Sequence, residues 1–266
     1  MNESPLITIV MPAYNAEKYI SETIESVLRQ SFSDYELLVV NDFSRDNTAE
    51  IIGNYIGRDS RINIINLPSN MGAPAGPRNI GIHQAKGKWI AFLDADDIWH
   101  PNKLQRQIEV LEITKARFCS TKMVDFVEST DVKLDDALSS DYEWVSFLQQ
   151  LIRYRTPTSS VIVEKSLIAE NLFNEDIRFK AREDLDCWLR CHEIIGKSVK
   201  ITTPMIGYRI IPGQISGNKW LMIKRHLYVL RQFKFRSGRK LGLTAYLFLV
   251  THFIFAFYNR KILKSM

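Results

Sequence analysis

The sequence predicts an α/β protein: a doubly wound, mainly parallel sheet with flanking helices, followed by a basic, aromatic helical tail. Three observations support this. Short apolar runs alternate with helical patterns over roughly the first hundred residues, polar clusters follow three of these runs, and the charge changes sign along the chain. A chain of 266 residues is long enough for one large core plus an appendage.

Four apolar runs have the composition of strands buried on both faces of a parallel sheet. They span residues 6–11, 36–40, 62–65 and 89–93. Apolar side chains recur at helical spacing in the first two intervals between them, at Ile20, Ile24, Val27 and Leu28 and at Ile51, Ile52, Tyr55 and Ile56. This alternation predicts repeated β-α units, which pack as a doubly wound sheet.

Polar residues directly after each apolar run are candidates for ligand contacts, because ligands of such sheets bind beyond the carboxyl ends of the strands. Three runs are followed by such clusters: Pro12, Ala13, Tyr14 and Asn15; Asn41, Asp42, Phe43 and Ser44; and Asp94, Ala95, Asp96 and Asp97. We expect all three clusters to face one crevice.

The acidic cluster has the composition of a metal site. Asp94 and Asp96 lie at a strand end, where two carboxylates can hold one Mg²⁺ or Mn²⁺ ion and leave positions open for phosphate oxygens. The alternative is a solvated acidic turn in which Asp97 caps the next helix. The position after a buried strand favours the metal site.

A metal site open to phosphate oxygens could serve the transfer of a sugar from a nucleoside diphosphate to an acceptor hydroxyl. Such a transfer also needs a base that removes the proton of that hydroxyl. The best-placed candidates are Glu183 and Asp184, an acidic pair that opens a predicted helix over residues 183–194, with Gly196 as its stop. Helix capping alone also explains such a pair. The pattern does not choose which of the two is the base.

The basic residues concentrate at the end of the chain. Residues 194–266 hold 14 Lys or Arg and no Asp or Glu, whereas the preceding residues hold 21 basic and 30 acidic side chains. Such a stretch suits an anionic surface, and its interleaved aromatic and aliphatic residues favour a membrane over nucleic acid. We therefore expect no nucleic-acid partner.

Within this tail, residues 220–240 have the composition of a helix in the headgroup region, and the 18 residues 241–258 form an apolar stretch. That length is the lower limit for a bilayer span, and polar residues such as His252 weaken it. Attachment to the membrane surface is favoured; a span and a hairpin packed on the body are the alternatives. The expected division is a catalytic domain over 1–217, with halves 1–115 and 116–217, and a tail over 218–266.

The odd number of cysteines, Cys119, Cys187 and Cys191, lacks paired metal-finger spacing and argues against a disulfide framework. The first residues have neither a basic region nor an apolar core typical of a secretory signal. We therefore expect a cytoplasmic protein, peripheral on the inner face of the membrane.

Three ordered motifs closely resemble the family 2 glycosyltransferases with the GT-A fold: PLITIVMPAYNAEKYISETIESVL, VVNDFSRDN and NMGAPAGPRNIGIHQAKGKWIAFLDADD. The resemblance covers roughly residues 5–115 and returns at AREDLDCWLR and YRIIPGQIS. It implies an inverting transferase that moves a single sugar from a nucleotide sugar, with uridine as the preferred base, to a saccharide acceptor. By analogy, the acceptor is linked to a polyprenyl diphosphate in bacterial O-antigen, capsule or other surface-polysaccharide assembly.

The resemblance also implies roles for individual residues. The nucleotide-binding positions are Pro12, Ala13, Tyr14, Asn15, Asp42, Arg78, Asp94 and Ala95. Asp94 and Asp96 take the ribose and metal roles. Asp184 resembles the general base, with Glu183 contacting or orienting the acceptor, although the two are interchangeable on this pattern. Arg209 and Ser216 fall in a segment resembling a lid over the diphosphate.

Two positions depart from the family pattern. Phe43 stands where a glycine usually follows the base-binding aspartate, and Ile211 replaces a histidine common in the lid. The first departure alters the turn after Asp42. The second removes a possible metal or phosphate contact.

Three other functions are weighed against this one. A nicotinamide-dependent oxidoreductase is disfavoured, since the first strand lacks the Gly-x-Gly-x-x-Gly turn that follows it in dinucleotide-binding folds. A nucleotidyltransferase would share the acidic site, but this sequence lacks the glycine-rich, basic phosphate loop expected near the first strand of such an enzyme. A catalytically inactive scaffold that binds nucleotide sugar in a membrane assembly complex is the non-enzymatic alternative.

Overall fold

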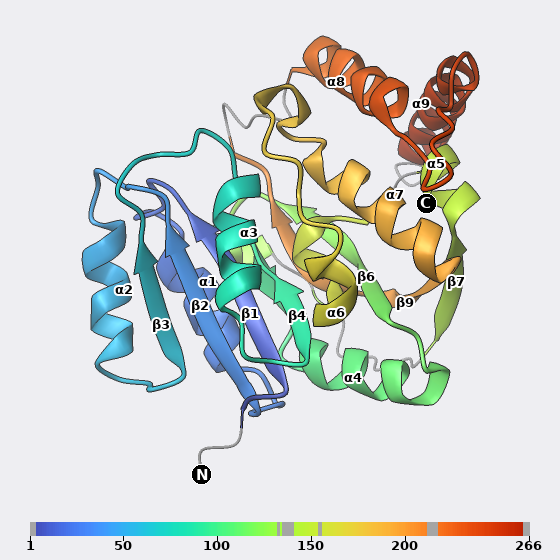
Figure 1. Ribbon diagram of the computed structural model, residues 1–266. Helices are drawn as coiled ribbons and strands as arrows, with labels where there is room; N and C mark the ends of the chain where they lie inside the picture. Colours follow the sequence, from blue (N-terminus) through green and yellow to red (C-terminus); the bar gives the residue numbers. More distant parts are fainter. Residues whose placement is uncertain (1–3, 132–133, 135–140, 154–155, 212–217, 263–266) are drawn as a thin grey trace.

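One large mixed sheet organises the protein. The computed structural model describes residues 4–131, 134, 141–153, 156–211 and 218–262. Within these residues nine strands form a single sheet in the order β3-β2-β1-β4-β8-β6-β9-β5, with β7 pairing with β9 (Figure 1).

The first half of the sheet is entirely parallel. Its strands are β1 (Ile7–Ala13), β2 (Tyr35–Asn41), β3 (Ile62–Asn66) and β4 (Trp89–Phe92). All seven residues of β2 are buried, as expected for a strand covered on both faces. The doubly wound arrangement predicted for this half is confirmed, and its strands begin and end within two residues of the predicted runs.

The second half of the sheet is mixed. β8 (Ile162–Glu164) runs antiparallel to both β4 and β6 (Phe118–Phe126). The long strand β9 (Lys197–Arg209) is parallel to β6 and antiparallel to β5 (Ile98–Trp99) and β7 (Tyr142–Ser146). The carboxyl ends of β6 and β9 therefore lie near the acidic turn that joins β4 to β5.

Helices cover both faces of the sheet (Figure 1). One face carries α1 (Ile20–Leu28), α2 (Thr48–Ile56) and α4 (Lys103–Thr114). The other carries α3 (Ala75–Gln84), α6 (Lys165–Ala169) and α7 (Glu183–Ile195). Alternate residues of β1 divide between the two apolar cores: Ile7, Ile9 and Met11 enter the first, and Val10 enters the second.

α7 occupies the residues predicted for it, and Gly196 follows its end with a φ of 72°. A left-handed residue after the last turn suits glycine, which has no Cβ to clash, so the predicted helix stop is confirmed. Between β6 and β8 the chain forms β7, α5 (Phe147–Arg153) and the short 3₁₀ turn η2 (Thr158–Ser160).

The tail folds back onto the body. α8 (Lys219–Gln232) and α9 (Thr244–Ile262) pack with α5 and α7 around a third apolar core. The helix expected over residues 220–240 ends at Gln232. The chain then turns through Gly238, whose φ is 84°, and a β-bridge joins Lys234 to Lys240. Backbone pairing across this turn replaces the last part of the expected helix.

α9 is apolar on two faces. Its inner face places Ala245, Phe248 and Leu249 in the third core. Its outer face leaves the large hydrophobic side chains Tyr246, Leu247, Val250 and Ile254 exposed. Among the helices that the structure describes, none combines the length and the apolar content needed to cross a membrane.

His192 makes the core sensitive to acid. Its imidazole is fully buried beside Phe118. The Nδ1 atom hydrogen-bonds to the Trp188 carbonyl, and the Nε2 atom lies 2.8 Å from Ser198 Oγ. Burial lowers the pKa of His192 to about 4. The unfolded chain, with a histidine pKa near 6.5, therefore binds more protons between these two values.

As the pH falls from about 6.5 to about 4, we expect the free energy of unfolding to decrease by up to about 3 kcal/mol through His192, because the unfolded chain takes up the proton that the folded chain excludes. Denaturant unfolding of the parent and His192→Gln at a series of pH values measures it. The variant should lose less stability on acidification, whereas His83→Gln, at an exposed position on α3, should follow the parent. Equal acid sensitivity in all three proteins would contradict the assignment.

Candidate active site

The turns after β1 and β2 are tied to each other. The Asn15 backbone N–H donates to Ser44 Oγ at 3.0 Å, and the Arg45 N–H donates to Asn15 Oδ1 at 2.9 Å. The Asp42 N–H donates to the Ala13 carbonyl at 2.8 Å. Ala13 is buried, Pro12 is half-buried in β1, and Tyr14 is half-exposed. The first two predicted clusters therefore lie side by side at one end of the sheet.

Asp42 lies at the base of this pair of turns, with only 4% of its surface exposed. Its carboxylate accepts the Met71 N–H at 2.8 Å and the Asn70 side-chain amide at 3.0 Å. Burial raises the pKa of Asp42, and the hydrogen bond from Met71 opposes this rise. The loop before α3 thus fixes the orientation of the carboxylate predicted to bind the nucleobase.

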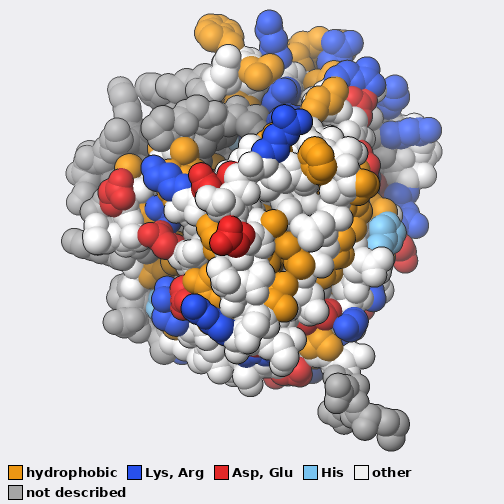
Figure 2. Space-filling view, turned by 90° about the vertical axis from the view of Figure 1, so that its left-hand side faces the viewer, with side chains coloured by type: hydrophobic (Ala, Val, Ile, Leu, Met, Phe, Trp, Pro, Cys, Tyr) orange, Lys and Arg blue, Asp and Glu red, His pale blue; other side chains and the backbone are white. Residues whose placement is uncertain are grey.

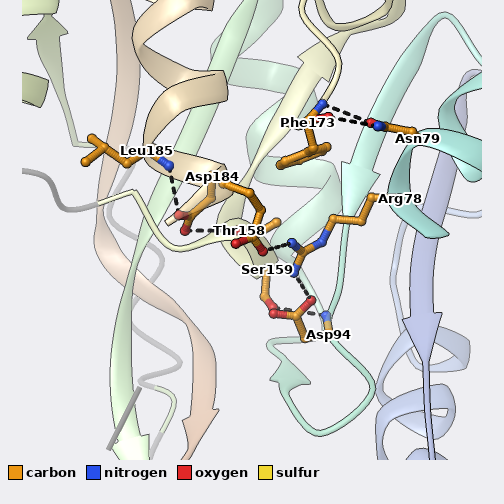
Figure 3. A network of polar contacts seen from close by, with 9 residues as sticks. Arg78, Asn79, Asp94, Thr158, Ser159, Phe173, Asp184 and Leu185 are labelled. Atoms are coloured by element: carbon orange, nitrogen blue, oxygen red, sulfur yellow. Dashed lines mark hydrogen bonds and ion pairs between the residues drawn. The ribbon is translucent and has the colours of Figure 1, made fainter. Parts of the chain in front are cut away.

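Arg78 on α3 connects two of the predicted acidic groups (Figure 3). Its Nη2 donates to Asp94 Oδ1 at 2.6 Å and its Nη1 donates to Glu183 Oε1 at 2.9 Å. The guanidinium lies 5.3 Å from the Phe173 ring centroid. Burial works against its charge, but Asp94 and Glu183 together raise the pKa of Arg78 above its ordinary value. The ion pair between Arg78 and Glu183 thereby joins α3 to the start of α7, which lies 105 positions further along the chain.

The acidic turn follows β4. Asp94 and Asp96 are both half-buried, and Ala95 between them is buried with its carbonyl accepting the Thr23 hydroxyl at 3.0 Å. Burial, and then the charge of Asp94, raise the pKa of Asp96 to about 6. The turn therefore holds two carboxylates that repel each other in a partly desolvated place.

This donor set suits a hard divalent cation, because it consists of carboxylate oxygens whose repulsion a cation would remove. Among the residues that the structure describes, no group of three or more His, Cys, Asp or Glu side chains is arranged to hold a metal ion. A cation at Asp94 and Asp96 would thus need further ligands, and diphosphate oxygens of a bound nucleotide have the right chemistry.

Asp97 holds the acidic turn in place through buried hydrogen bonds. It is 1% exposed, accepts the Ser159 hydroxyl at 2.5 Å and accepts the Arg209 N–H at 3.1 Å. The Ser159 hydroxyl in turn accepts the Asp94 N–H at 3.1 Å. Burial, and then the charges of Asp96 and Asp94, raise the pKa of Asp97 well above its usual range. The buried carboxylate thus joins the turn to η2 and to the end of β9.

Glu183 and Asp184 begin α7 in different surroundings. Glu183 is 3% exposed, bonds to Arg78 through Oε1, and has no hydrogen-bond partner for its buried Oε2 among the described residues. Burial raises the pKa of Glu183, while Arg78 lowers it. Asp184 is half-buried; its Oδ1 accepts the Leu185 N–H at 2.8 Å and its Oδ2 lies 3.4 Å from the Thr158 hydroxyl (Figure 3).

Arg209 ends β9 as a buried anchor. Its Nε donates to the Asp96 carbonyl at 2.9 Å, and its Nη2 pairs with Glu22 of α1. The guanidinium lies between the rings of Tyr19 and Phe126, at 4.6 Å and 4.4 Å from their centroids. The predicted contact of Arg209 with a diphosphate stays a prediction, and Ser216 lies outside the described residues.

Several supporting residues escaped the sequence analysis, chief among them Ser159, Glu22 and Asn70. Each acts through a contact between segments far apart in the chain. No local pattern marks a serine in a 3₁₀ turn as the partner of an aspartate 62 residues away. Asn70 and Glu22 carried a signal, since Asn70 opens the third of the family motifs and Glu22 lies within the first.

The family follows from a comparison with known proteins. A family model described as "Glycosyl transferase family 2" matches residues 8–167. The chain belongs to glycosyltransferase family 2. The resemblance inferred from the motifs is confirmed, and the protein is a glycosyltransferase enzyme.

Two relatives of this family 2 glycosyltransferase are similar over most of their length. The putative teichuronic acid biosynthesis glycosyltransferase TuaG of Bacillus subtilis (strain 168) is 30% identical over 231 residues, which cover 87% of this chain and 89% of that protein. The UDP-Glc:alpha-D-GlcNAc-diphosphoundecaprenol beta-1,3-glucosyltransferase WfaP of Escherichia coli is 30% identical over 239 residues, covering 89% and 90%.

Solved structures share the fold. S. aureus TarS 1-349 in complex with UDP-GlcNAc matches with a TM-score of 0.70 and 21% identity over 85% of this chain and 64% of that chain. The mannosyltransferase PcManGT from Pyrobaculum calidifontis in complex with GDP-Man and Mn2+ matches with a TM-score of 0.66 and 16% identity, over 93% and 70%. The chain therefore spans slightly less than two thirds of the TarS chain. These similarities confirm the GT-A fold.

The Arg78 bridge yields a prediction about stability. Arg78→Met removes the guanidinium that pairs with the Glu183 carboxylate and leaves a buried charge uncompensated, so we expect a loss of about 3–5 kcal/mol in the free energy of unfolding. Adding Glu183→Gln removes that charge and should restore part of the loss. Urea unfolding of the parent, both single variants and the double variant measures the coupling. A double variant no more stable than Arg78→Met would contradict this account.

Proposed function

We propose that this enzyme is an inverting, metal-dependent glycosyltransferase that moves a single sugar from a UDP-sugar to a saccharide linked to a polyprenyl diphosphate. Its setting would be the synthesis of O-antigen, capsule or another bacterial surface polysaccharide. The observation that carries the proposal is the Arg78 bridge, which joins the acidic turn after β4 to the acidic pair that opens α7. One side chain thus connects the donor side of the crevice to the residues expected to activate the acceptor.

Asp184 is the better candidate for the general base. Glu183 is almost fully buried and committed to Arg78, so neither its position nor its hydrogen bonding suits an encounter with an acceptor hydroxyl. Asp184 is half-buried beside it, and a hydrogen bond from the next backbone N–H holds its Oδ1. In the proposed mechanism Oδ2 receives the hydroxyl proton as the acceptor oxygen attacks the anomeric carbon. Glu183 positions α7 through Arg78.

The donor diphosphate would lie over the acidic turn. Asp94 and Asp96 would hold a Mn²⁺ or Mg²⁺ ion, which supplies Lewis-acid neutralisation of the leaving diphosphate. Asp42 would accept hydrogen bonds from the nucleobase, with Pro12, Ala13, Tyr14 and Asn15 around base and ribose. Arg209 anchors the strand that leads towards the proposed lid. The PcManGT complex with both GDP-Man and Mn2+ supports a metal in this fold.

The donor and acceptor are inferred from the relatives. TarS was solved with UDP and with UDP-GlcNAc, and WfaP is named for glucosyl transfer to GlcNAc-diphosphoundecaprenol. Both relatives, taken with the site, favour a uridine donor and a lipid-linked acceptor. Residues 1–217 would carry the chemistry, whereas residues 218–266 would hold the enzyme on the cytoplasmic face of the membrane.

The tail has the surface expected for that contact. Six exposed basic residues lie on α8 and on the turn between α8 and α9: Lys224, Arg231, Lys234, Arg236, Arg239 and Lys240. Figure 2 shows Lys and Arg side chains gathered with hydrophobic ones at the top of the molecule, the level of α8 in Figure 1. The apolar stripe of Tyr246, Leu247, Val250 and Ile254, together with these basic residues of the same tail, suits an anionic bilayer, where apolar side chains insert and cations meet headgroups.

Replacing the base should abolish turnover without abolishing donor binding. For Asp184→Asn we expect kcat to fall about 10²–10⁴-fold, the usual contribution of a general base. The assay combines Mn²⁺, a panel of nucleotide sugars and a GlcNAc-diphospholipid acceptor, and measures nucleoside diphosphate release and the anomer of the product. Asp186→Asn, two residues along α7 and paired with Arg190, is the matched control and should keep near-parental activity.

Each alternative gives a distinct result in this assay. When a nucleoside triphosphate and a sugar 1-phosphate replace the nucleotide sugar, release of inorganic diphosphate with formation of a nucleotide sugar would indicate a nucleotidyltransferase. Donor binding without turnover by the parent, with every donor and acceptor tried, would indicate a catalytically inactive scaffold. Full activity of Asp184→Asn would refute the assigned base.

Membrane binding should depend on the outer face of α9. Leu247→Gln combined with Val250→Gln removes two exposed apolar side chains from the stripe, and we expect at least about 10-fold weaker partitioning into phosphatidylglycerol-containing vesicles. Co-sedimentation measures this. Ile113→Gln, which removes a hydrophobic side chain that is 73% exposed on α4, should bind as the parent does.

Lack of parental binding to anionic vesicles would refute the membrane assignment. If, instead, the parent self-associates in solution and the double substitution makes it monomeric, the stripe is an interface between two copies of the chain. Light scattering of the same proteins distinguishes these results.

A further inference from the structure

Phe43 adopts a backbone conformation that its side chain disfavours. Its φ is 60°, in the left-handed region where a Cβ crowds the backbone. A bulky aromatic residue is uncommon there, and a glycine takes this conformation without strain. This positive φ suits the glycine that resembling sequences usually carry at this position, and Phe43 adopts it at a cost in backbone strain.

The surrounding contacts hold the turn in this shape. Asn41 accepts the Ser44 N–H at 3.2 Å and donates to Asn66 at 2.8 Å. Asp42 is fixed by hydrogen bonds to Met71 and Asn70, and Ser44 is tied to Asn15. With both neighbours of Phe43 anchored, the chain has no freedom to relax the strained residue.

Packing in an apolar core does not explain why position 43 carries an aromatic side chain. Phe43 is 43% exposed, and it belongs to none of the three apolar cores. Tyr14 on the turn after β1 is 50% exposed, and Met71, whose N–H bonds to Asp42, is 42% exposed. Three large apolar side chains thus remain partly in water around one nearly buried carboxylate.

We propose that Phe43 is a nucleobase-stacking residue that works with Asp42 to select the donor. Asp42 offers a fixed carboxylate to N–H groups on the edge of a base, since each of its oxygens keeps a second lone pair. Phe43 offers a π-face to the plane of the same base, and stacking on aromatic rings is a strong, general way to hold a base. Edge and face together recognise a planar base with an N–H, as in uracil. This inference rests on the proposed nucleotide-sugar donor.

Binding measurements on three substitutions test the stacking role. For Phe43→Gly and Phe43→Ala we expect UDP to bind about 10-fold more weakly with Mn²⁺ present, which corresponds to about 1.4 kcal/mol. Phe43→Tyr should bind UDP as the parent does. Inorganic diphosphate, which has no base, should bind all four proteins equally. Isothermal titration calorimetry reports these affinities.

Thermal unfolding separates this role from a structural one. Phe43→Gly should raise the melting temperature by about 2 °C, because glycine relieves the positive φ, whereas Phe43→Ala keeps the strain and should not. Weaker UDP binding together with higher stability is not expected of a residue that merely supports the fold. Trp144→Ala, which removes a similarly exposed aromatic side chain from β7, should leave UDP binding unchanged.

The outcomes separate this inference from the function on which it rests. If the parent binds UDP and Phe43→Gly binds it equally well, the stacking role is overturned and the proposed function stands. If affinity for inorganic diphosphate falls in parallel with that for UDP, Phe43 acts on the whole turn and the stacking role is also overturned. If the parent binds no nucleotide, both proposals fail.

Discussion

The buried guanidinium of Arg78 is the interaction on which the site depends. It draws Asp94, directly after β4, and Glu183, at the start of α7, to one point, although these residues lie far apart in the chain. An ion network of this kind is weak evidence for stability, because desolvating the charges costs about as much as their attraction returns. Its evident consequence is geometric: α7 cannot turn or slide without separating charges in a dry environment. The orientation of Asp184 follows from that constraint.

The acidic turn after β4 shows how close carboxylates are kept in place. Asp97 accepts hydrogen bonds from Ser159 and from the Arg209 backbone, and these contacts fix the chain next to Asp96. The raised pKa values of Asp96 and Asp97 have burial and mutual repulsion as their common causes. In the proposed function, such preorganisation lowers the reorganisation needed when a charged donor binds, which is a general feature of active sites that act electrostatically.

The tail joins two requirements in one helix. The inner residues of α9, such as Ala245 and Leu249, follow helical spacing and complete the third core, and the outer residues, such as Leu247 and Val250, repeat the same spacing on the opposite side. Because α8 and α9 pack on α7 in one apolar core, a displacement of the tail would also displace the helix that carries Asp184. In the proposed function this packing gives the crevice a set orientation relative to the lipid that carries the acceptor.

The sequence by itself determined the parallel half of the fold and the positions of the polar clusters from which the proposed site is built. Buried strands are continuous apolar runs and their ends carry polar clusters, so Asp42, Asp94 and the start of α7 could be located from local pattern alone. The mixed half of the sheet, the end of α8 at Gln232 and the double-sided packing of α9 came only from the tertiary structure. So did the partners of Arg78 and the strained backbone of Phe43. The physical reason is that periodicity reports which face of an element is buried, whereas the choice among buried partners depends on segments as far as 187 residues apart meeting in space.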